Sequence, residues 1–148
     1  MEIRFENKVA FITGAAGGIG YAAARMFAEA GASVVMADLD SRVTDRAKEL
    51  EAEGHNAIGI RCDVSDEAVA VFGKLDIAYN NVGIHAAVRE DLAETEGWDF
   101  DRVISVNLRG VWNCMKYELV EMKKHGKGAI VNCSSQGGLV GIPCIGAY

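Results

Sequence analysis

A glycine-rich turn between an apolar run and a helix-forming segment constrains the fold of this chain more than any other feature. The turn, residues 13–20 (TGAAGGIG), follows the apolar run 9–12 and precedes residues 21–30, which are rich in Ala, Met and Phe. A strand that enters a helix through glycines leaves unpaired backbone N–H groups and the positive end of the helix dipole facing one point. Glycine also lets a ligand approach the backbone closely. The turn therefore predicts a pyrophosphate site, with an ordinary turn as the alternative if nothing else supports it.

An acidic residue closes the next apolar run. Residues 33–37 predict a buried strand that leads directly into Asp38, twenty positions after Gly18. A carboxylate at this point can accept hydrogen bonds from the 2′- and 3′-hydroxyls of a ribose and would repel a 2′-phosphate. Leu39 follows, where an Arg or Lys could have held such a phosphate. We therefore predict NAD(H) in preference to NADP(H), the alternative for Asp38 being a solvated loop acid.

Length, charge and hydropathy exclude several classes of protein. The chain has 148 residues, 50% of them hydrophobic, which suffices for one domain with a core. Its net charge of −6, with no basic run longer than Lys123-Lys124, argues against nucleic acid and anionic membranes as partners. The N-terminus lacks the apolar core of a signal peptide, and no apolar stretch approaches the ~20 residues that span a bilayer, so we expect a cytoplasmic protein.

The cysteines and histidines give no sign of a metal site. The four cysteines contain no CxxC pair and are predicted to be reduced thiols in or near the core. The three histidines are scattered among loop-like neighbours and are predicted to lie at the surface. We therefore predict that the protein binds no metal.

Strand and helix patterns alternate along the chain, which predicts an α/β fold with a parallel sheet. The predicted strands are residues 8–13, 33–37, 57–62, 75–79 and 129–133, and the predicted helices are residues 18–30, 41–53 and 98–124. Ser41 is predicted to cap the second helix. Asp63 and Val64 follow the third strand, and because ligands of open parallel sheets lie beyond the carboxyl ends of the strands, we expect these two residues to contact an adenine.

The connection between the third and fourth strands is too short. Only residues 64–74 separate them, whereas a parallel crossover takes a dozen or more residues, most of them helical. Either the crossover helix has been shortened, or residues are missing from the sequence around positions 68–71. We favour the second explanation.

The last predicted helix carries an amide within an apolar stripe. Asn107 is flanked on the predicted face by Phe100, Val103, Ile104, Leu108, Val111 and Met115. An unpaired buried amide costs ~1–3 kcal/mol, so Asn107 must have a partner, a nearby carbonyl being the plain structural choice. Trp112 and Tyr117 lie on the back of this helix. Ser134-Ser135 ends the fifth strand, on the same side of the sheet as the glycine turn.

Taken as an ordered set, these residues resemble the NAD(P)-dependent short-chain dehydrogenases/reductases. The residues that carry the resemblance are Thr13-Gly14-x-x-x-Gly18-x-Gly20, Asp38, Asp63-Val64, Asn80-Asn81-Val82-Gly83, Asn107, and Ser135 with Tyr148 thirteen positions later. The family usually has Ala where this chain has Val82. The resemblance implies a Rossmann-type doubly wound parallel sheet of order 3-2-1-4-5, with helices on both faces. It also implies that residues 1–148 form one dinucleotide-binding domain and that the C-terminal part of the family fold is absent.

The resemblance also implies a site. In this family a hydride moves between nicotinamide C4 and the carbon of an alcohol or ketone. Tyr148 matches the tyrosine that moves the hydroxyl proton, Ser135 matches the serine that hydrogen-bonds the substrate oxygen, and Asn107 matches the asparagine that holds a water in the proton relay. The cofactor contacts implied are Gly14, Ala16, Gly17, Gly18, Ile19, Asp38, Leu39, Asp63, Val64, Asn80 and Gly83.

One departure from the family bears on activity. The family has a lysine four residues beyond the tyrosine, and its charge helps to lower the phenol pKa from ~10 by ~2–3 units, so that the tyrosine can act as a base. This sequence ends at Tyr148. We therefore expect the 148-residue chain to turn over roughly a thousandfold more slowly than a complete enzyme, and we expect the sequence to be part of a longer one.

Partners and rival functions follow from the same comparison. The substrate is expected to be a small alcohol or ketone, and family members are commonly dimers or tetramers built on the helix that matches residues 98–124. One rival function is a nucleotide-binding module without catalysis. Another is a methyltransferase that uses adenosylmethionine, although Ser135 and Tyr148 at their spacing argue against it. A P-loop nucleotidase is excluded because the glycine turn lacks the Lys-Ser/Thr pair.

Overall fold

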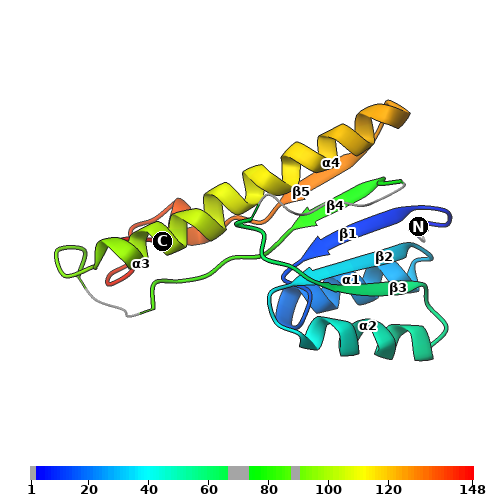
Figure 1. The fold of residues 1–148 in the computed structure, drawn as a ribbon, viewed down its shortest axis with the longest axis horizontal. Helices are drawn as coiled ribbons and strands as arrows, with labels where there is room; N and C mark the ends of the chain where they lie inside the picture. The colour runs from blue at the N-terminus through cyan, green and yellow to red at the C-terminus, as the bar shows by residue number, and fades with distance from the viewer. Residues whose placement is uncertain (1–2, 67–73, 88–90) are drawn as a thin grey trace.

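The computed structural model describes residues 3–66, 74–87 and 91–148. Its centre is a five-stranded sheet of order β3-β2-β1-β4-β5, in which each neighbouring pair of strands is parallel (Figure 1). This arrangement confirms the predicted doubly wound α/β fold and its strand order. All carboxyl ends of the strands point to the left in Figure 1, toward α3 and the C-terminus.

The helices and strands begin and end close to their predicted limits. The strands are β1 (Val9–Thr13), β2 (Ser33–Asp38), β3 (Ala57–Arg61), β4 (Ile77–Asn80) and β5 (Ala129–Asn132). The helices are α1 (Gly18–Glu29), α2 (Arg42–Ala52), α3 (Gly97–Ile104), a π-helical segment (Ser105–Gly110) and α4 (Val111–His125), followed by a 3-10 turn (Gln136–Gly138). Gly31, Gly54 and Gly126 follow three of the helices with φ of +93°, +93° and +67°, the left-handed conformation that ends helices and that glycine adopts without strain.

The predicted cap of α2 is wrong in detail. The Ser41 side chain makes no capping hydrogen bond. Asp40 does this instead, because its Oδ1 accepts a hydrogen bond of 2.9 Å from the backbone N–H of Arg42. The first turn of α2 is therefore held by the residue immediately before the one that the sequence pattern indicated.

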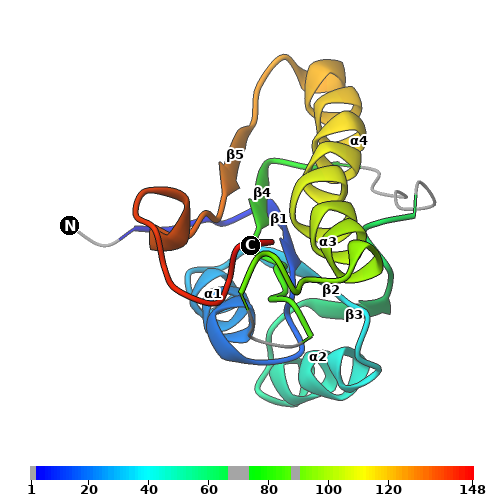
Figure 2. The same cartoon turned by 90° about the vertical axis from the view of Figure 1, so that its left-hand side faces the viewer.

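The sheet separates two hydrophobic layers, one on each face (Figure 2). On one face Ala10 and Ile12 of β1 pack with α1 and α2, while on the other Phe11 packs toward Cys114 and Met122 of α4. Successive side chains of a strand point to opposite faces, so the near-continuous apolar run of β1 fills both layers. The sheet is thereby fixed between the helices, with its carboxyl ends left for a site.

The buried face of the last helix differs from the predicted one. Val103 is buried as predicted, but Phe100, Ile104 and Leu108 are exposed. The other buried positions of this helical region are Asp99, Gly110, Asn113, Cys114, Glu118 and Met122. The π-helical segment between α3 and α4 explains part of this difference, because its wider turn shifts the phase of a stripe counted at 3.6 residues per turn. The burial of polar residues explains the rest. Trp112 is exposed as predicted, whereas Tyr117 is half-buried.

Other predictions have mixed outcomes. The proposed gap near residues 68–71 lies outside the described residues. All four cysteines are free thiols, but only Cys114 is buried and Cys62 partly so, since Cys133 and Cys144 are exposed. Within the described part of the chain, no group of His, Cys, Asp and Glu side chains could hold a metal ion. No helix in that part is long and apolar enough to cross a membrane.

Candidate active site

A cavity of about 550 Å³ lies where the ends of β1, β2, β3 and β4 meet. It is lined by Gly14, Ala37, Asp38, Leu39, Asp40, Cys62, Asp63, Val64, Asn81, Val82, Gly83, Ile84 and Val106. Six of the predicted cofactor contacts are among these residues, namely Gly14, Asp38, Leu39, Asp63, Val64 and Gly83. Ala16, Gly17, Gly18 and Ile19 lie in the adjoining turn and the first turn of α1 but do not line the cavity.

The glycine turn has the geometry of an anion cradle. Gly14 and Gly18 have φ of +68° and +53°, which disfavours other residues. A Cβ added to Gly14 would lie 2.9 Å from the Asn81 side-chain nitrogen, and one added to Gly20 would collide with the carbonyl oxygen of Gly14, so the turn, α1 and β4 are in close contact. No side chain caps α1, and its first turn contains no acidic residue. The positive end of this helix dipole is therefore open to an anion.

Asp38 connects this turn to the end of β2. Its Oδ2 accepts a hydrogen bond of 2.9 Å from the Ala16 N–H, and its Oδ1 accepts one of 2.9 Å from the Asp40 N–H. Two backbone donors thus fix the orientation of the carboxylate at the wall of the cavity. Each carboxylate oxygen can accept a further hydrogen bond, so Asp38 can still accept from hydroxyl groups of a ligand.

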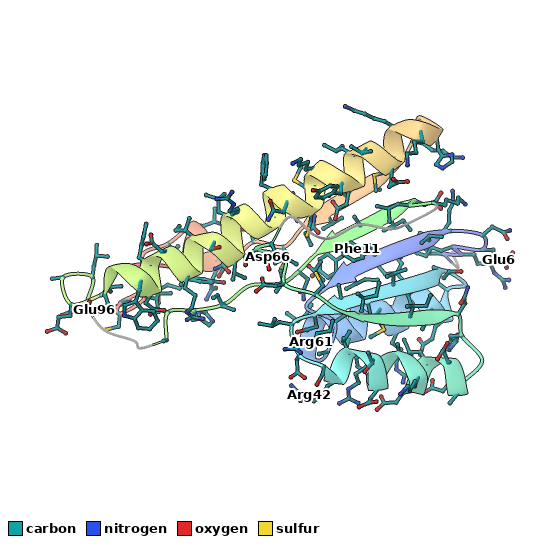
Figure 3. The ribbon with its side chains drawn as sticks, viewed as in Figure 1. Glu6, Phe11, Arg42, Arg61, Asp66 and Glu96 are labelled. Atoms are coloured by element: carbon teal, nitrogen blue, oxygen red, sulfur yellow. The ribbon has the colours of Figure 1, made fainter. Side chains whose placement is uncertain are left out.

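Two arginines that the sequence reasoning missed lie near Asp38. Arg42 forms an ion pair of 2.7 Å with Asp40, and Arg61 donates a hydrogen bond of 3.0 Å to the carbonyl oxygen of Leu39. Both lie where β3 ends and α2 begins (Figure 3). The Arg42 guanidinium lowers the pKa of Asp40. Both arginines therefore already interact with oxygen atoms of neighbouring residues.

Asn80, which was predicted to contact the cofactor, does not line the larger cavity. The amide of Asn80 is buried away from the cavity and donates to Glu118 Oε2 (3.1 Å) and Asn132 Oδ1 (2.9 Å). Asn81 lines the cavity instead. Its backbone N–H donates to Thr13 Oγ1 (3.0 Å), and its side-chain amide donates to the Thr13 carbonyl oxygen (3.2 Å). The alternation of side chains along β4 distinguishes the two residues, since Asn80 belongs to the strand and faces the core.

The thiol beside this cavity is unreactive. Burial raises the pKa of Cys62 to about 11, and the nearby negative charges of Asp63 and Asp66 contribute to the rise. Asp63 itself is fixed, because its Oδ1 accepts hydrogen bonds from the N–H and the hydroxyl group of Ser65. Cys62 therefore stays protonated near neutral pH and acts as part of the cavity wall.

A second, smaller cavity of about 200 Å³ brings the three predicted catalytic residues together. It is lined by Asn81, Val82, Gly83, Asn107, Cys133, Ser134, Ser135, Gly138 and Tyr148. Residues 81–83, which we call the shared wall, also line the larger cavity. The two cavities therefore adjoin, with Asp38 lining one and Ser135 and Tyr148 lining the other.

Asn107 is held by the backbone that follows the shared wall. Its Oδ1 accepts a hydrogen bond of 2.8 Å from the Ile84 N–H, and its Nδ2 donates one of 2.9 Å to the Ile84 carbonyl oxygen. The amide in the apolar stripe thus has two partners, as its burial requires. It lies in the π-helical segment, a feature that frequently occurs at functional sites.

Ser135 and Tyr148 both line the smaller cavity, and Gly137 is close to each of them. Ser135 Oγ accepts a hydrogen bond of 3.1 Å from the Gly137 N–H, so its hydroxyl proton can be donated elsewhere. Gly137 contacts the Tyr148 ring closely, since a Cβ there would lie 3.3 Å from ring carbons. His85, predicted only to be a surface residue, is exposed but its ring contacts that of Tyr148, with centroids 4.5 Å apart and the planes tilted by 38°. Arg102 donates to the His85 carbonyl oxygen (2.8 Å) and helps to fix this loop.

The sequence model of the family described as short chain dehydrogenase matches residues 8–148. The chain belongs to this family. Its relatives include the cis-4-hydroxycyclohexanecarboxylate dehydrogenase of Sinomonas cyclohexanicum, 44% identical over 146 residues that cover 93% of this chain and 58% of that protein. The chain is therefore a member of an oxidoreductase family whose named relatives include alcohol dehydrogenases.

Solved structures of short chain dehydrogenases have the same fold. A short chain dehydrogenase/reductase from Burkholderia phymatum in complex with NAD superimposes with a TM-score of 0.90 at 34% identity, covering 99% of this chain and 55% of that one. A gluconate 5-dehydrogenase from Burkholderia cenocepacia J2315 in complex with NADP and tartrate gives a TM-score of 0.90 at 32% identity, covering 99% and 61%. Such neighbours bind NAD or NADP, and this chain spans less than two thirds of the length of each protein compared.

Proposed function

We propose that residues 1–148 are the dinucleotide-binding domain of an NAD-dependent oxidoreductase that moves a hydride between its cofactor and a secondary alcohol or ketone. The observation that carries this proposal is the shared wall. It joins the larger cavity, with Asp38 at its side, to the smaller one that holds Ser135 and Tyr148. A long ligand with a reactive end fits this pair of cavities better than a small ligand confined to one of them.

The residues of the larger cavity suit an adenosine diphosphate. The open N-terminus of α1 and the left-handed Gly14 and Gly18 would receive the pyrophosphate. Asp38 would accept from the ribose hydroxyls, and Asp63 and Val64 would contact the adenine. Asp38 and Asp40 would repel a 2′-phosphate, which favours NAD over NADP even though Arg42 and Arg61 lie nearby.

The residues of the smaller cavity suit proton transfer beside a carbonyl carbon. When bound, the nicotinamide supplies or accepts the hydride. The Ser135 hydroxyl would donate a hydrogen bond to the substrate oxygen and stabilise the charge that develops on it. The Tyr148 hydroxyl would take the alcohol proton in oxidation and return it in reduction. Asn107, through its two hydrogen bonds to Ile84, would hold the loop that closes this cavity, and we propose that it also orients a water in the proton relay.

The substrate class follows from a relative. The dehydrogenase from Sinomonas cyclohexanicum, whose name specifies cis-4-hydroxycyclohexanecarboxylate, is 44% identical to this chain. We therefore propose a cyclic secondary alcohol, or the matching ketone, as the substrate. The substrate ring would lie against Tyr148, which lines the smaller cavity, and against the exposed His85 ring that contacts it.

A second copy of the chain is the proposed partner. Phe100, Ile104, Leu108 and Trp112 recur every four residues along α3, the π-helical segment and α4, and Leu108 and Trp112 are 66% and 55% exposed. An exposed apolar stripe of this kind marks an interaction surface. Sedimentation of the wild-type chain and of Leu108→Glu tests the proposal, which predicts a dimer or tetramer that the substitution dissociates. A monomeric wild-type chain would contradict it.

Single-turnover oxidation tests the proposed reaction. The wild-type chain is mixed with NAD and cis-4-hydroxycyclohexanecarboxylate, and NADH formation is followed by absorbance. The proposal predicts NADH formation at least about a thousandfold slower than in a complete enzyme, which Tyr148→Phe slows by a further factor of about 100 or more, because the proton acceptor is lost. Tyr117→Phe, on α4 and outside both cavities, is the matched control and should retain the wild-type rate. NADH binding without any turnover would instead favour the non-catalytic nucleotide-binding module.

A further inference from the structure

A carboxyl group is buried between α4 and the sheet, behind the shared wall. The side chain of Glu118 is only 3% exposed, and its Oε2 accepts a hydrogen bond of 3.1 Å from the Asn80 amide. Its Oε1 has no hydrogen-bond partner among the described residues. Asn80, 1% exposed, also donates to Asn132 Oδ1 at 2.9 Å. One amide thus joins α4, β4 and β5 at a single point.

This buried carboxyl group is difficult to explain by stability alone. Taking a carboxyl group out of water is costly unless it is fully hydrogen-bonded, and buried polar groups of this kind can often be replaced by apolar residues without loss of stability. Among residues 3–66, 74–87 and 91–148, Glu118 Oε1 has no hydrogen-bond partner and neither does Asn80 Oδ1. A leucine at position 118 would avoid this penalty, so the gain from a glutamate must lie in the geometry that it imposes.

The joined residues lead directly to both cavities. Asn80 and Asn132 are opposite each other in the last pair of the β4–β5 ladder, and the Cys133 N–H donates to the Asn80 carbonyl oxygen at 2.8 Å. Asn81 follows Asn80 and begins the shared wall, while Ser134 and Ser135 lie two and three residues after Asn132. The positions of the shared wall and of Ser135 therefore depend on how β4 and β5 end.

We propose that Glu118 is a positioning residue of the active site. Acting through Asn80, it holds the carboxyl ends of β4 and β5 in register, so that the shared wall lies against the bound dinucleotide and Ser135 lies opposite Tyr148. This role rests on the proposed function, since it assumes that NAD lies along the shared wall. In this role Glu118 affects the site only through Asn80 and contacts neither the cofactor nor the substrate.

Fluorescence titration with NADH tests this role in the wild-type chain and two variants of Glu118. Glu118→Leu removes the acceptor for Asn80, whereas Glu118→Gln keeps a carbonyl oxygen for it. We expect the dissociation constant of NADH to rise at least about tenfold in Glu118→Leu and to stay within about twofold of the wild-type value in Glu118→Gln. Glu121→Leu, one turn later on α4, removes a carboxylate bound to Lys124 and should leave NADH affinity unchanged. Equal affinity in Glu118→Leu and wild type, or equal loss in Leu and Gln variants, would overturn the proposal.

Two further measurements keep the test decisive. If Glu118→Leu does not fold, Asn132→Ala removes the β5 branch of the same contact and should weaken NADH binding as well; wild-type affinity in that variant would overturn the proposal. If the wild-type chain binds no NADH, the proposed function fails. The positioning role is then decided by amide hydrogen exchange of residues 81–83, which Glu118→Leu should accelerate and Glu118→Gln should not. Unchanged exchange in both variants would overturn it.

Discussion

Replacing Glu118 by glutamine should change the pH dependence of stability in a direction that the structure fixes. Burial raises the pKa of this carboxyl group from its ordinary 4.5 to about 7, against the opposing effect of the hydrogen bond from Asn80. The folded chain therefore binds this proton more tightly than the unfolded chain does. Stability from the protonated carboxyl group is complete below pH 4.5 and is lost as the pH rises to about 7, above which no further loss occurs.

The pKa difference sets the size of the effect. It corresponds to about 3 kcal/mol of unfolding free energy lost by the wild-type chain between the two pKa values. Glutamine has nearly the same shape, offers Asn80 the same carbonyl acceptor and never ionises. The stability of Glu118→Gln relative to the wild type should therefore rise by about 3 kcal/mol between pH 4 and pH 8.

Urea unfolding of both proteins across this range measures the difference directly. Every other titrating group is common to the two chains, so its contribution cancels when one curve is subtracted from the other. Glu121→Gln provides the control for the loss of a carboxylate from α4, because Glu121 is paired with Lys124 and makes no contact with Asn80. A difference between Glu118→Gln and wild type that stays constant, or that falls as the pH rises, would refute the reasoning.

Two further predictions concern the ends of the sheet. Asp76 is buried, which raises its pKa, but hydrogen bonds from Lys8, the Val9 N–H and Lys74 outweigh burial and bring the pKa to about 2. Asp76→Asn should therefore cost about 2 kcal/mol of unfolding free energy at pH 7, and this loss should disappear as the pH falls from about 4 to about 2. Urea unfolding at pH 7 and at pH 2 measures the loss. A loss that persists at pH 2 would contradict the lowered pKa of Asp76. Gly20→Ala should lower the thermal midpoint and abolish NADH binding, because its Cβ would collide with the Gly14 carbonyl oxygen, whereas Gly17→Ala has open space and should unfold at the wild-type temperature. Equal midpoints for these two alanine variants would contradict the close packing of α1 on the glycine turn.

The sheet could be predicted from the sequence because its signals are local. Largely apolar runs of five or six residues, each followed by a glycine or a polar residue, identify the strands. The glycine turn with Asp38 identifies where a dinucleotide-binding family places its first two strands. The order of the strands then follows from the family pattern. The structure confirms both.

The buried face of the last helix could not be predicted in the same way. Asp99, Asn113 and Glu118 are buried because each finds a partner on another segment: the Ala87 N–H, the Val64 carbonyl oxygen and the Asn80 amide. Hydropathy periodicity assigns such residues to the solvent side. The π-helical segment then displaces the remaining pattern, so that Leu108 is exposed.

The site contains residues that only the fold brings together. Arg42 and Arg61 come from α2 and β3 and meet near Asp40, and His85 reaches Tyr148 from a loop 63 positions earlier in the chain. No spacing rule connects them. Asn80 and Asn81 are an exception, because the period of two along a strand places their side chains on opposite sides, a signal that our prediction of Asn80 did not use.

The dissociation constants of NADH and NADPH for the wild-type chain test the central claim most directly. In the proposed complex the glycine turn binds the pyrophosphate and Asp38, oriented by the Ala16 N–H, accepts hydrogen bonds from the ribose hydroxyls, while Asp40 pairs with Arg42. It predicts that NADH binds at least about tenfold more tightly than NADPH, a difference of about 1.4 kcal/mol, and that Asp38→Ala removes most of it. NADPH binding as tightly as NADH, or a preference that survives Asp38→Ala, would contradict the account.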